Sequence, residues 1–344
     1  MTAKVVSFGC LNSQLAKDQT KVVMDRLQEA NPRPACRLQV LPSPITDEQR
    51  EGEPFLATSA AEVEYLETQL LAGDYRLAVI RALDLVLPLR EGICFAAVPQ
   101  RDTPFDAFLT RQNAIIDDMP EGSVIGVMNL RSRTQMSVLW PNLEFKLLRG
   151  GMQAALETLL RRCELDGLVA PAAVAEHLGL QGIVAEIFNP ELILPSGGQG
   201  IMAVLSREDD TEVRELLAPL HCSATQREME AEHAFLQRFA SDLELPVGVL
   251  AKITGQRMAI TGAVGSSNTA AAALQRKEGS SDQAAALGMA LAESILQSDE
   301  ALIGLLEAEF PEGLPMEEED AVEVEADPDV ALLKEFPELD EERD

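Results

Sequence analysis

The stretch from residue 75 to residue 108 constrains the fold of this chain most strongly. It begins with four consecutive apolar residues, Leu77 to Ile80, a run typical of buried strands in α/β sheets. One carboxylate, Asp84, follows this run, and a second apolar run covers residues 93–98. Ligands of α/β folds bind at the carboxyl ends of strands, so Asp84 is a candidate functional acid. The alternative interpretation of Asp84 is a turn residue that ends the strand.

Strand and helix patterns alternate along the first part of the sequence, and this alternation predicts an α/β fold. Ser59 and Glu62 form a capping box that predicts the start of one helix. Polar segments over 42–54 and 99–106 predict a loop and a turn. The predicted strands are 4–8, 37–41, 77–80, 93–98, 123–128, 143–148 and 165–173, the last of which leads into a short helix. The predicted helices are 13–28, 59–71, 130–140 and 152–162.

A glycine-rich turn within residues 191–207 leads into a further predicted strand. Glycine lets backbone N–H groups approach an anion closely, so an anion site is one interpretation of this turn. A crossover between domains is the other. Beyond residue 212 the pattern predicts a separate small α/β domain. Its predicted helices are 225–239 and 284–297, and its predicted strands are 245–249 and 258–264, with a turn, a strand and a loop over 265–282.

The net charge of −29 is unevenly distributed along the chain. Residues 311–344 hold 15 acidic and 2 basic residues, a net charge of −13, which leaves 42 acidic and 26 basic residues, a net charge of −16, in the remainder. Such a field opposes binding to DNA, RNA or anionic lipid, so we expect no nucleic-acid or membrane partner. The tail over 311–344 is expected to be disordered and is a candidate contact for a protein partner.

The cysteines and histidines carry no metal or disulfide pattern. Five cysteines without a CxxC pair argue against a disulfide framework and for a reducing compartment. Three histidines lack the spacing of metal ligands, so no metal site is predicted. The N-terminal segment shows the pattern of neither a signal peptide nor a membrane span. We therefore expect a cytoplasmic protein, and we expect it to be a monomer.

Six short segments, in order and in register, resemble hydroxymethylbilane synthase, also called porphobilinogen deaminase. They are AAVPQRDTPFDAF (96–108), GVMNLRSRTQM (126–136), LRGG (148–151), ILPSGGQG (193–200), AFL (234–236) and LPVG (245–248). The resemblance implies three α/β domains, of which the first two are similar to the paired lobes of periplasmic solute-binding proteins around a cleft. The implied domains are 1–99 together with 200–217, then 100–199, then 218–310, followed by the acidic tail 311–344.

The resemblance also implies an activity in tetrapyrrole biosynthesis. Enzymes of the family join porphobilinogen units head to tail, and each step releases ammonia. A dipyrromethane cofactor, attached to a cysteine of the third domain, primes the growing chain. An aspartate in the cleft stabilises cationic intermediates, because a fixed carboxylate favours positive charge as it develops. Arginine and lysine side chains bind the acetate and propionate groups of the pyrroles.

Carried over residue by residue, the resemblance assigns Asp84 as the catalytic aspartate. Arg131 and Arg149 match two carboxylate-binding arginines. Ser132 replaces a third arginine, for which Arg133 is a partial substitute. The implied substrate-binding residues are Ser13, Gln19, Arg131, Arg133, Arg149, Gly198, Gln199 and Gly200.

Several cationic positions of the family have lost their lysine or arginine here. These positions carry Leu11, Ser59 or a neighbour, Leu83, Ser132, Ala155 and His177. A hydrogen bond to a charged group contributes about 1.5–3 kcal/mol, so four lost partners would forfeit about 6–12 kcal/mol of binding free energy without compensation. Such a loss is too large for the standard binding mode.

The position of the family's cofactor cysteine holds Leu243. Pro246 matches the proline of the following segment, and Ser241-Asp242 replaces a flanking pair of glycines. No cysteine follows Cys222, which lies 21 residues before Leu243. A leucine side chain cannot form a thioether, so we expect no covalently bound dipyrromethane.

The sequence leaves three functional hypotheses open. The first is a non-catalytic or repurposed family member that binds a pyrrole, a tetrapyrrole or another small carboxylate through Arg131 and Arg149. The second is an active synthase, a transferase, that holds its primer non-covalently or through another cysteine. The third is a solute-binding or scaffold protein whose acidic tail recruits a partner and which needs no tetrapyrrole.

Overall fold

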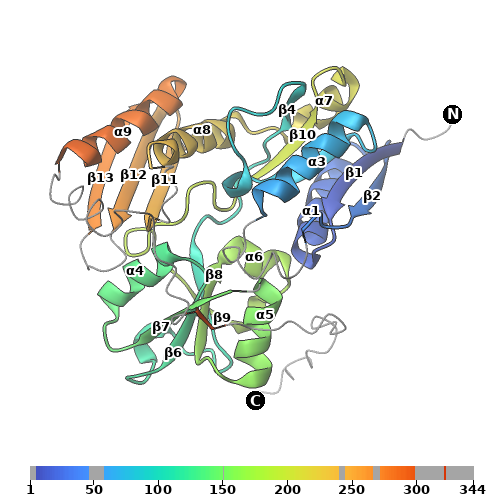
Figure 1. Cartoon of the computed structure of the whole chain (residues 1–344). Helices are drawn as coiled ribbons and strands as arrows, with labels where there is room; N and C mark the ends of the chain where they lie inside the picture. Colours follow the sequence, from blue (N-terminus) through green and yellow to red (C-terminus); the bar gives the residue numbers. More distant parts are fainter. Residues whose placement is uncertain are drawn as a thin grey trace, which may run out of the picture.

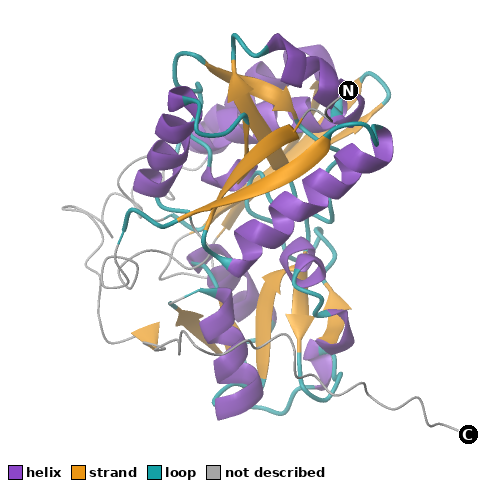
Figure 2. Ribbon diagram, turned by 90° about the vertical axis from the view of Figure 1, so that its right-hand side faces the viewer, coloured by secondary structure: helices purple, strands orange, loops and turns teal. Residues whose placement is uncertain are grey.

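Two α/β lobes and a smaller C-terminal domain form the structure, a computed structural model (Figure 1). It describes residues 5–45, 58–149, 151–239, 245–265, 272–298 and 321–322. The sheet of each lobe is flanked by helices, as the second view shows (Figure 2). The predicted α/β fold, with two lobes and a small C-terminal α/β domain, is therefore confirmed.

The first lobe is built on a sheet with the strand order β2-β1-β3-β10-β4. β1 runs parallel to β2 and β3, whereas β10 is antiparallel to both β3 and β4. β10 comes from late in the sequence, so the chain returns to this lobe after building the second. The strands are β1 (Val5–Leu11), β2 (Ala35–Leu41), β3 (Leu77–Arg81), β4 (Ile93–Ala97) and β10 (Met202–Arg207). The helices are α1 (Gln14–Ala30), α3 (Ala60–Ala72) and α7 (Thr211–Leu217).

The second lobe repeats this arrangement. Its sheet has the order β14-β7-β6-β8-β5-β9, in which β6 is parallel to β7 and β8 while β5 is antiparallel to β8 and β9. The strands are β5 (Asp106–Leu109), β6 (Val124–Val127), β7 (Glu144–Leu148), β8 (Gly167–Pro171), β9 (Val184–Ile187) and the two-residue β14 (Ala321–Val322). The helices are α4 (Leu130–Leu139), α5 (Met152–Glu157) and α6 (Ala172–His177). A π-helical turn, Thr158–Arg162, extends α5.

The third domain packs two helices against an antiparallel sheet. Its strands are β11 (Val247–Thr254), β12 (Arg257–Gly265) and β13 (Ala272–Ser280), and its helices are α8 (Ser223–Gln237) and α9 (Ala284–Ser298). Phe235, Ile260 and Leu291 are fully buried in the core between the layers. Burial of such side chains contributes about 1.5–3 kcal/mol each, which is the main driving force for holding α8 and α9 on the sheet.

Local signals placed most elements correctly. The predicted capping box is formed on both sides: the Ser59 hydroxyl accepts from the Glu62 N–H, and the Glu62 carboxylate accepts from the Ser59 N–H. All of β3 is buried, as its apolar run predicts.

Within the described ranges, no helix is both long and apolar enough to cross a membrane.

Other predictions need correction. The predicted turn over 99–106 is wrong at its end, because Asp106 begins β5. β9 and α7 were not predicted at all. Most of the predicted loop 42–54 and of the tail 311–344 lies outside the described residues. The exception in the tail is β14, which pairs in parallel with the end of β7, so the expectation of disorder does not hold for those two residues.

Candidate functional site

The predicted site residues follow parallel strands in both lobes. Ser13 follows β1 and Asp84 follows β3 in the first lobe, while Arg131 follows β6 and Arg149 follows β7 in the second. Parallel strands end at the same edge of a sheet, and ligands of α/β folds bind along that edge. The topology therefore gathers these residues at one edge of each sheet.

Asp84 is held by groups of its own chain. It ends the short 3₁₀ turn Ala82–Asp84 after β3, and its side chain is 1% exposed. Its Oδ2 accepts hydrogen bonds from Arg81 Nε at 2.7 Å and from the Thr58 hydroxyl at 2.8 Å. Its Oδ1 accepts from Arg81 Nη2 at 3.0 Å and from the Thr58 N–H at 3.2 Å. Arg81 and Asp84 thus form a bidentate ion pair, the strongest hydrogen-bonding geometry between these groups.

The turn that carries Asp84 is also fixed to the third domain. His233 of α8 donates from Nε2 to the Ala82 carbonyl at 2.8 Å, and the Ala82 N–H donates to the Ile201 carbonyl at 2.9 Å. Burial lowers the pKa of His233, which favours the neutral imidazole with its proton on Nε2. The neighbouring Leu83 keeps 37% of its surface exposed. An aliphatic side chain therefore lies beside Asp84.

Arg131 lies in the interior, at 3% exposure. Its guanidinium donates to the Asp106 carboxylate at 2.6 Å, to the Leu194 carbonyl at 2.7 Å and to the Ser196 hydroxyl at 3.1 Å. Gln199, at 2% exposure, donates to the other oxygen of Asp106 at 2.8 Å. These contacts join α4 and β5 to the glycine-rich turn. Arg131 and Gln199 therefore stabilise the link between the lobes.

The glycine-rich turn does bind an anion, but this anion belongs to the third domain. The Gly198 N–H donates to the Glu232 carboxylate at 2.6 Å, with Gly198 in the left-handed region at φ +76°. A Cβ at Gly198 would come within 2.8 Å of the Leu83 nitrogen, so the approach requires glycine. Glu232 is 0% exposed and also accepts from Arg101 at 2.6 Å and from the Ala251 N–H at 2.8 Å. This turn is thus a crossover that holds an internal carboxylate, and an anion-binding site for a ligand stays a prediction.

A second ion-paired cluster joins the two lobes directly. Asp102 accepts a hydrogen bond from Arg26 of α1 at 2.6 Å, and His177 at the end of α6 lies 3.3 Å from it. Burial raises the pKa of Asp102, but the hydrogen bonds from His177 and Arg26 outweigh it and hold the pKa below its ordinary value. An adjacent pocket of about 480 Å³ is lined by Arg26, Ala30, Pro99, Gln100, Arg101, Asp102, Pro219 and Leu220. None of the predicted site residues lines this pocket.

The remaining predicted residues differ in exposure. Ser13 is exposed and caps α1, where its hydroxyl accepts from the Ala16 N–H at 3.1 Å. Gln19 is buried on α1 at 8% exposure. Arg133 on α4 and Arg149 after β7 are half-buried. Gly200, at φ +77°, lies in the turn before β10.

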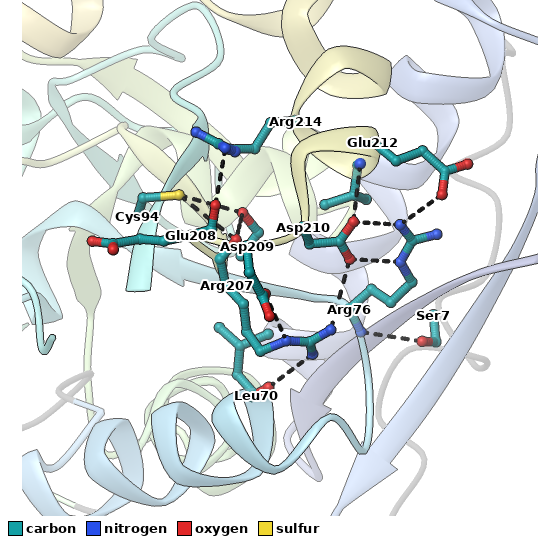
Figure 3. A network of polar contacts seen from close by, with 12 residues as sticks. Ser7, Leu70, Arg76, Cys94, Arg207, Glu208, Asp209, Asp210, Glu212 and Arg214 are labelled. Atoms are coloured by element: carbon teal, nitrogen blue, oxygen red, sulfur yellow. Dashed lines mark hydrogen bonds and ion pairs between the residues drawn. The ribbon is translucent and has the colours of Figure 1, made fainter. Parts of the chain in front are cut away.

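A further polar network lies at the opposite edge of the first sheet (Figure 3). Arg76, just before β3, donates from Nε to the Asp210 carboxylate at 2.7 Å and lies 3.3 Å from Glu212. Asp210 caps α7, where its carboxylate accepts from the Val213 N–H. Arg76 precedes β3 whereas Asp84 follows it, so this network is a structural feature away from the candidate site.

Sequence reasoning missed the partners that fix these residues. Arg81, Asp106, Asp102 and Glu232 each bind a residue of the site or of the links around it, and none of them was predicted as a functional residue. Only Arg81 left a local signal, because an arginine and an aspartate three positions apart can pair across a tight turn.

Position 243 lies outside the described residues. Within the described part of the chain, no group of three or more His, Cys, Asp or Glu side chains could hold a metal ion.

The sequence position that matches the cofactor cysteine of the family holds a leucine in this chain. Leu243 supplies no sulfur. Cys222, the nearest thiol before it, lies directly before α8, with its N–H bonded to the Val98 carbonyl at 2.8 Å. The thiol of Cys10 is buried, and that of Cys163 is exposed after the π-helical turn of the second lobe. No thiol stands at the anchor position.

Two solved structures match about two thirds of this chain at low sequence identity. The VFT2 domain of BvgS from Bordetella pertussis is 16% identical, with a TM-score of 0.36, and the match covers 67% of this chain and 92% of that domain. The methionine-binding protein MetQ is 14% identical, with a TM-score of 0.38, and the match covers 67% of this chain and 94% of that protein.

Comparison of the amino-acid sequence with known families and proteins identifies a family. Residues 6–215 match the family domain "Porphobilinogen deaminase, dipyromethane cofactor binding domain", and residues 226–297 match "Porphobilinogen deaminase, C-terminal domain". The porphobilinogen deaminase of Roseiflexus sp. (strain RS-1) is 33% identical over 293 residues, which cover 84% of this chain and 95% of the relative. That of Syntrophus aciditrophicus (strain SB) is also 33% identical, over 85% of this chain and 95% of the relative. The chain belongs to the porphobilinogen deaminase family.

Proposed function

We propose that this family member does not polymerise porphobilinogen and instead binds a pyrrole, a tetrapyrrole or another small carboxylate between its lobes. The observation that carries the proposal is the bidentate pair between Arg81 and Asp84. A carboxylate that serves cationic intermediates has to be available to them. Here an internal guanidinium occupies it, and the Thr58 hydroxyl and N–H complete its hydrogen bonds.

Two substitutions support the same conclusion. Leu83 places an aliphatic group next to Asp84, at the position of a family lysine. Leu243 stands at the position of the cofactor cysteine and can form no thioether. The Arg81–Asp84 pair, the leucine at position 83 and the leucine at position 243 affect different parts of porphobilinogen polymerisation. Reversal of one of these changes would therefore not restore the activity.

Carboxylate binding is assigned to Arg133 and Arg149 of the second lobe. Both are half-buried and follow strands at the ligand-binding edge of the sheet. Arg131, which the sequence favoured for this role, is already bonded to Asp106 in the interior. Arg131 is 3% exposed whereas Arg133 and Arg149 are half-buried, so we assign the ligand contact to Arg133 and Arg149 on their exposure.

Isothermal titration of the full-length protein with porphobilinogen analogues and with uroporphyrin, a polycarboxylate tetrapyrrole, tests the proposal. Arg149→Ser should weaken carboxylate binding by about tenfold or more, since a hydrogen bond to a charged group contributes about 1.5–3 kcal/mol. The matched control is Arg90→Ser, which removes an exposed arginine that bonds Thr68 in the first lobe. Absence of binding to every pyrrole and tetrapyrrole, or an equal effect of both substitutions, would refute the proposal.

A further inference from the structure

The environment of Asp84 also bears on which pyrroles this protein accepts. An ionised carboxylate offers about four lone-pair directions to hydrogen-bond donors. Each oxygen of Asp84 already accepts one bond from Arg81 and one from Thr58, and the side chain is 1% exposed. A ligand group that approaches this turn meets a neutral ion pair and not a bare negative charge.

Two exposed aliphatic side chains lie close to Asp84 in the sequence. Leu83 is 37% exposed and Val86 is 72% exposed, and they flank Asp84 in the sequence. An ammonium group placed against such a surface would lose water without gaining a partner, which carries a free-energy cost. A neutral ring or a methyl group would gain from the same contact.

We infer that this site selects carboxylated pyrroles and tetrapyrroles that lack an aminomethyl group, and that Arg81 is the residue that sets this selectivity. The inference rests on the proposed function and specifies its ligand. Porphobilinogen carries a protonated aminomethyl group, for which an open aspartate would be the natural partner. With Asp84 paired to Arg81, that attraction is cancelled.

The size of the effect follows from the bond that the ammonium group would have made. A charge-assisted hydrogen bond to an available Asp84 would favour porphobilinogen over its deaminated counterpart by about 10-fold to 100-fold. Loss of this bond should remove the preference for porphobilinogen. Replacement of Arg81 by a small neutral residue should restore that preference.

The test compares two probes on the full-length protein by isothermal titration. One probe is porphobilinogen, and the other is the pyrrole with the same acetate and propionate groups but a methyl in place of the aminomethyl group. We expect the unmodified protein to bind the methyl pyrrole at least as tightly as porphobilinogen. Arg81→Ser should shift the ratio of dissociation constants toward porphobilinogen by about tenfold or more, and the control Arg90→Ser should leave the ratio unchanged.

A second measurement guards against misfolding of Arg81→Ser. Unfolding of Arg81→Gln, Asp84→Asn and the double variant gives the coupling between the two side chains, which should be large if the pair forms. A tenfold preference of the unmodified protein for porphobilinogen, an unchanged ratio in Arg81→Ser, or no coupling would overturn the inference while leaving carboxylate binding intact. Failure of both probes to bind any of the proteins would overturn the proposed function and this inference with it.

Discussion

Replacement of Glu232 by alanine should destabilise this protein severely, because one carboxylate ties the third domain to the segments that connect the lobes. Glu232 lies on α8 and is 0% exposed. It accepts hydrogen bonds from the Arg101 guanidinium at 2.6 Å, from the Gly198 N–H at 2.6 Å and from the Ala251 N–H at 2.8 Å. Alanine removes the acceptor and leaves a buried guanidinium and two buried amides.

The loss of unfolding free energy can be estimated from the donors that lose Glu232 as an acceptor. Removal of one partner of a buried ion pair costs about 3–5 kcal/mol when the remaining charge has no other partner. Arg101 would keep the Gln199 carbonyl at 2.9 Å and the Glu228 carboxylate at 3.9 Å, which places the cost of losing this ion pair at the low end of that range. Each backbone N–H that loses its acceptor adds about 1–3 kcal/mol unless water enters. We therefore expect Glu232→Ala to lower the free energy of unfolding by at least about 3 kcal/mol. Glu232→Gln keeps the size of the side chain and should cost less.

Urea unfolding at neutral pH measures this change, and hydrogen exchange of the Gly198 and Ala251 amides locates it. Both amides should exchange faster in Glu232→Ala. The control is Glu293→Ala on α9, whose side chain is 55% exposed and lies 3.8 Å from Arg238, so its effect should stay within about 0.5 kcal/mol. A loss below about 1 kcal/mol in Glu232→Ala, or unchanged exchange of both amides, would refute the assigned role of Glu232.

Two further predictions concern pH. A hydrogen bond from Arg76 is the main cause that holds the pKa of Asp210 below its ordinary value, so the pair stabilises the fold above about pH 4 and its contribution is lost as the pH falls further. Arg76→Met should lower the melting temperature at pH 7, and a difference that persists undiminished at acidic pH would contradict this. Burial lowers the pKa of His233, so the unfolded chain takes up a proton first and stability falls as the pH drops below about 6.5. His233→Gln should flatten the melting temperature between about pH 5 and pH 6.5, and an unchanged slope would argue against burial as the cause.

The elements that the sequence predicted well are those with local signals. The apolar run at 77–80 predicted β3, and Ser59 with Glu62 predicted the start of α3, because both patterns depend on neighbours along the chain. β5 was missed because its four residues begin with Asp106, directly after a proline-containing polar segment. Its burial depends on β8 and β9, which lie far away in the sequence.

The place of Asp84 after β3 was predictable from the sequence, but the hydrogen bonds of its carboxylate were not. The carboxyl end of β3 correctly placed Asp84 at the edge of a sheet, since that inference needs only strand direction. Arg81 and Thr58 donate the hydrogen bonds that its carboxylate accepts, and only the folded turn brings these groups together. Arg131 illustrates the same limit, because its partner Asp106 is 25 residues away and no sequence pattern joins them.

The most direct test of the central claim is the mass of the intact full-length protein, purified and then incubated with porphobilinogen. The account predicts the mass of the unmodified chain before and after incubation, since Leu243 offers no sulfur and Asp84 is bound by Arg81. It also predicts that no hydroxymethylbilane forms in the same sample. A protein that carries a pyrrole adduct, or one that converts porphobilinogen at a rate well above the buffer control, would contradict the account.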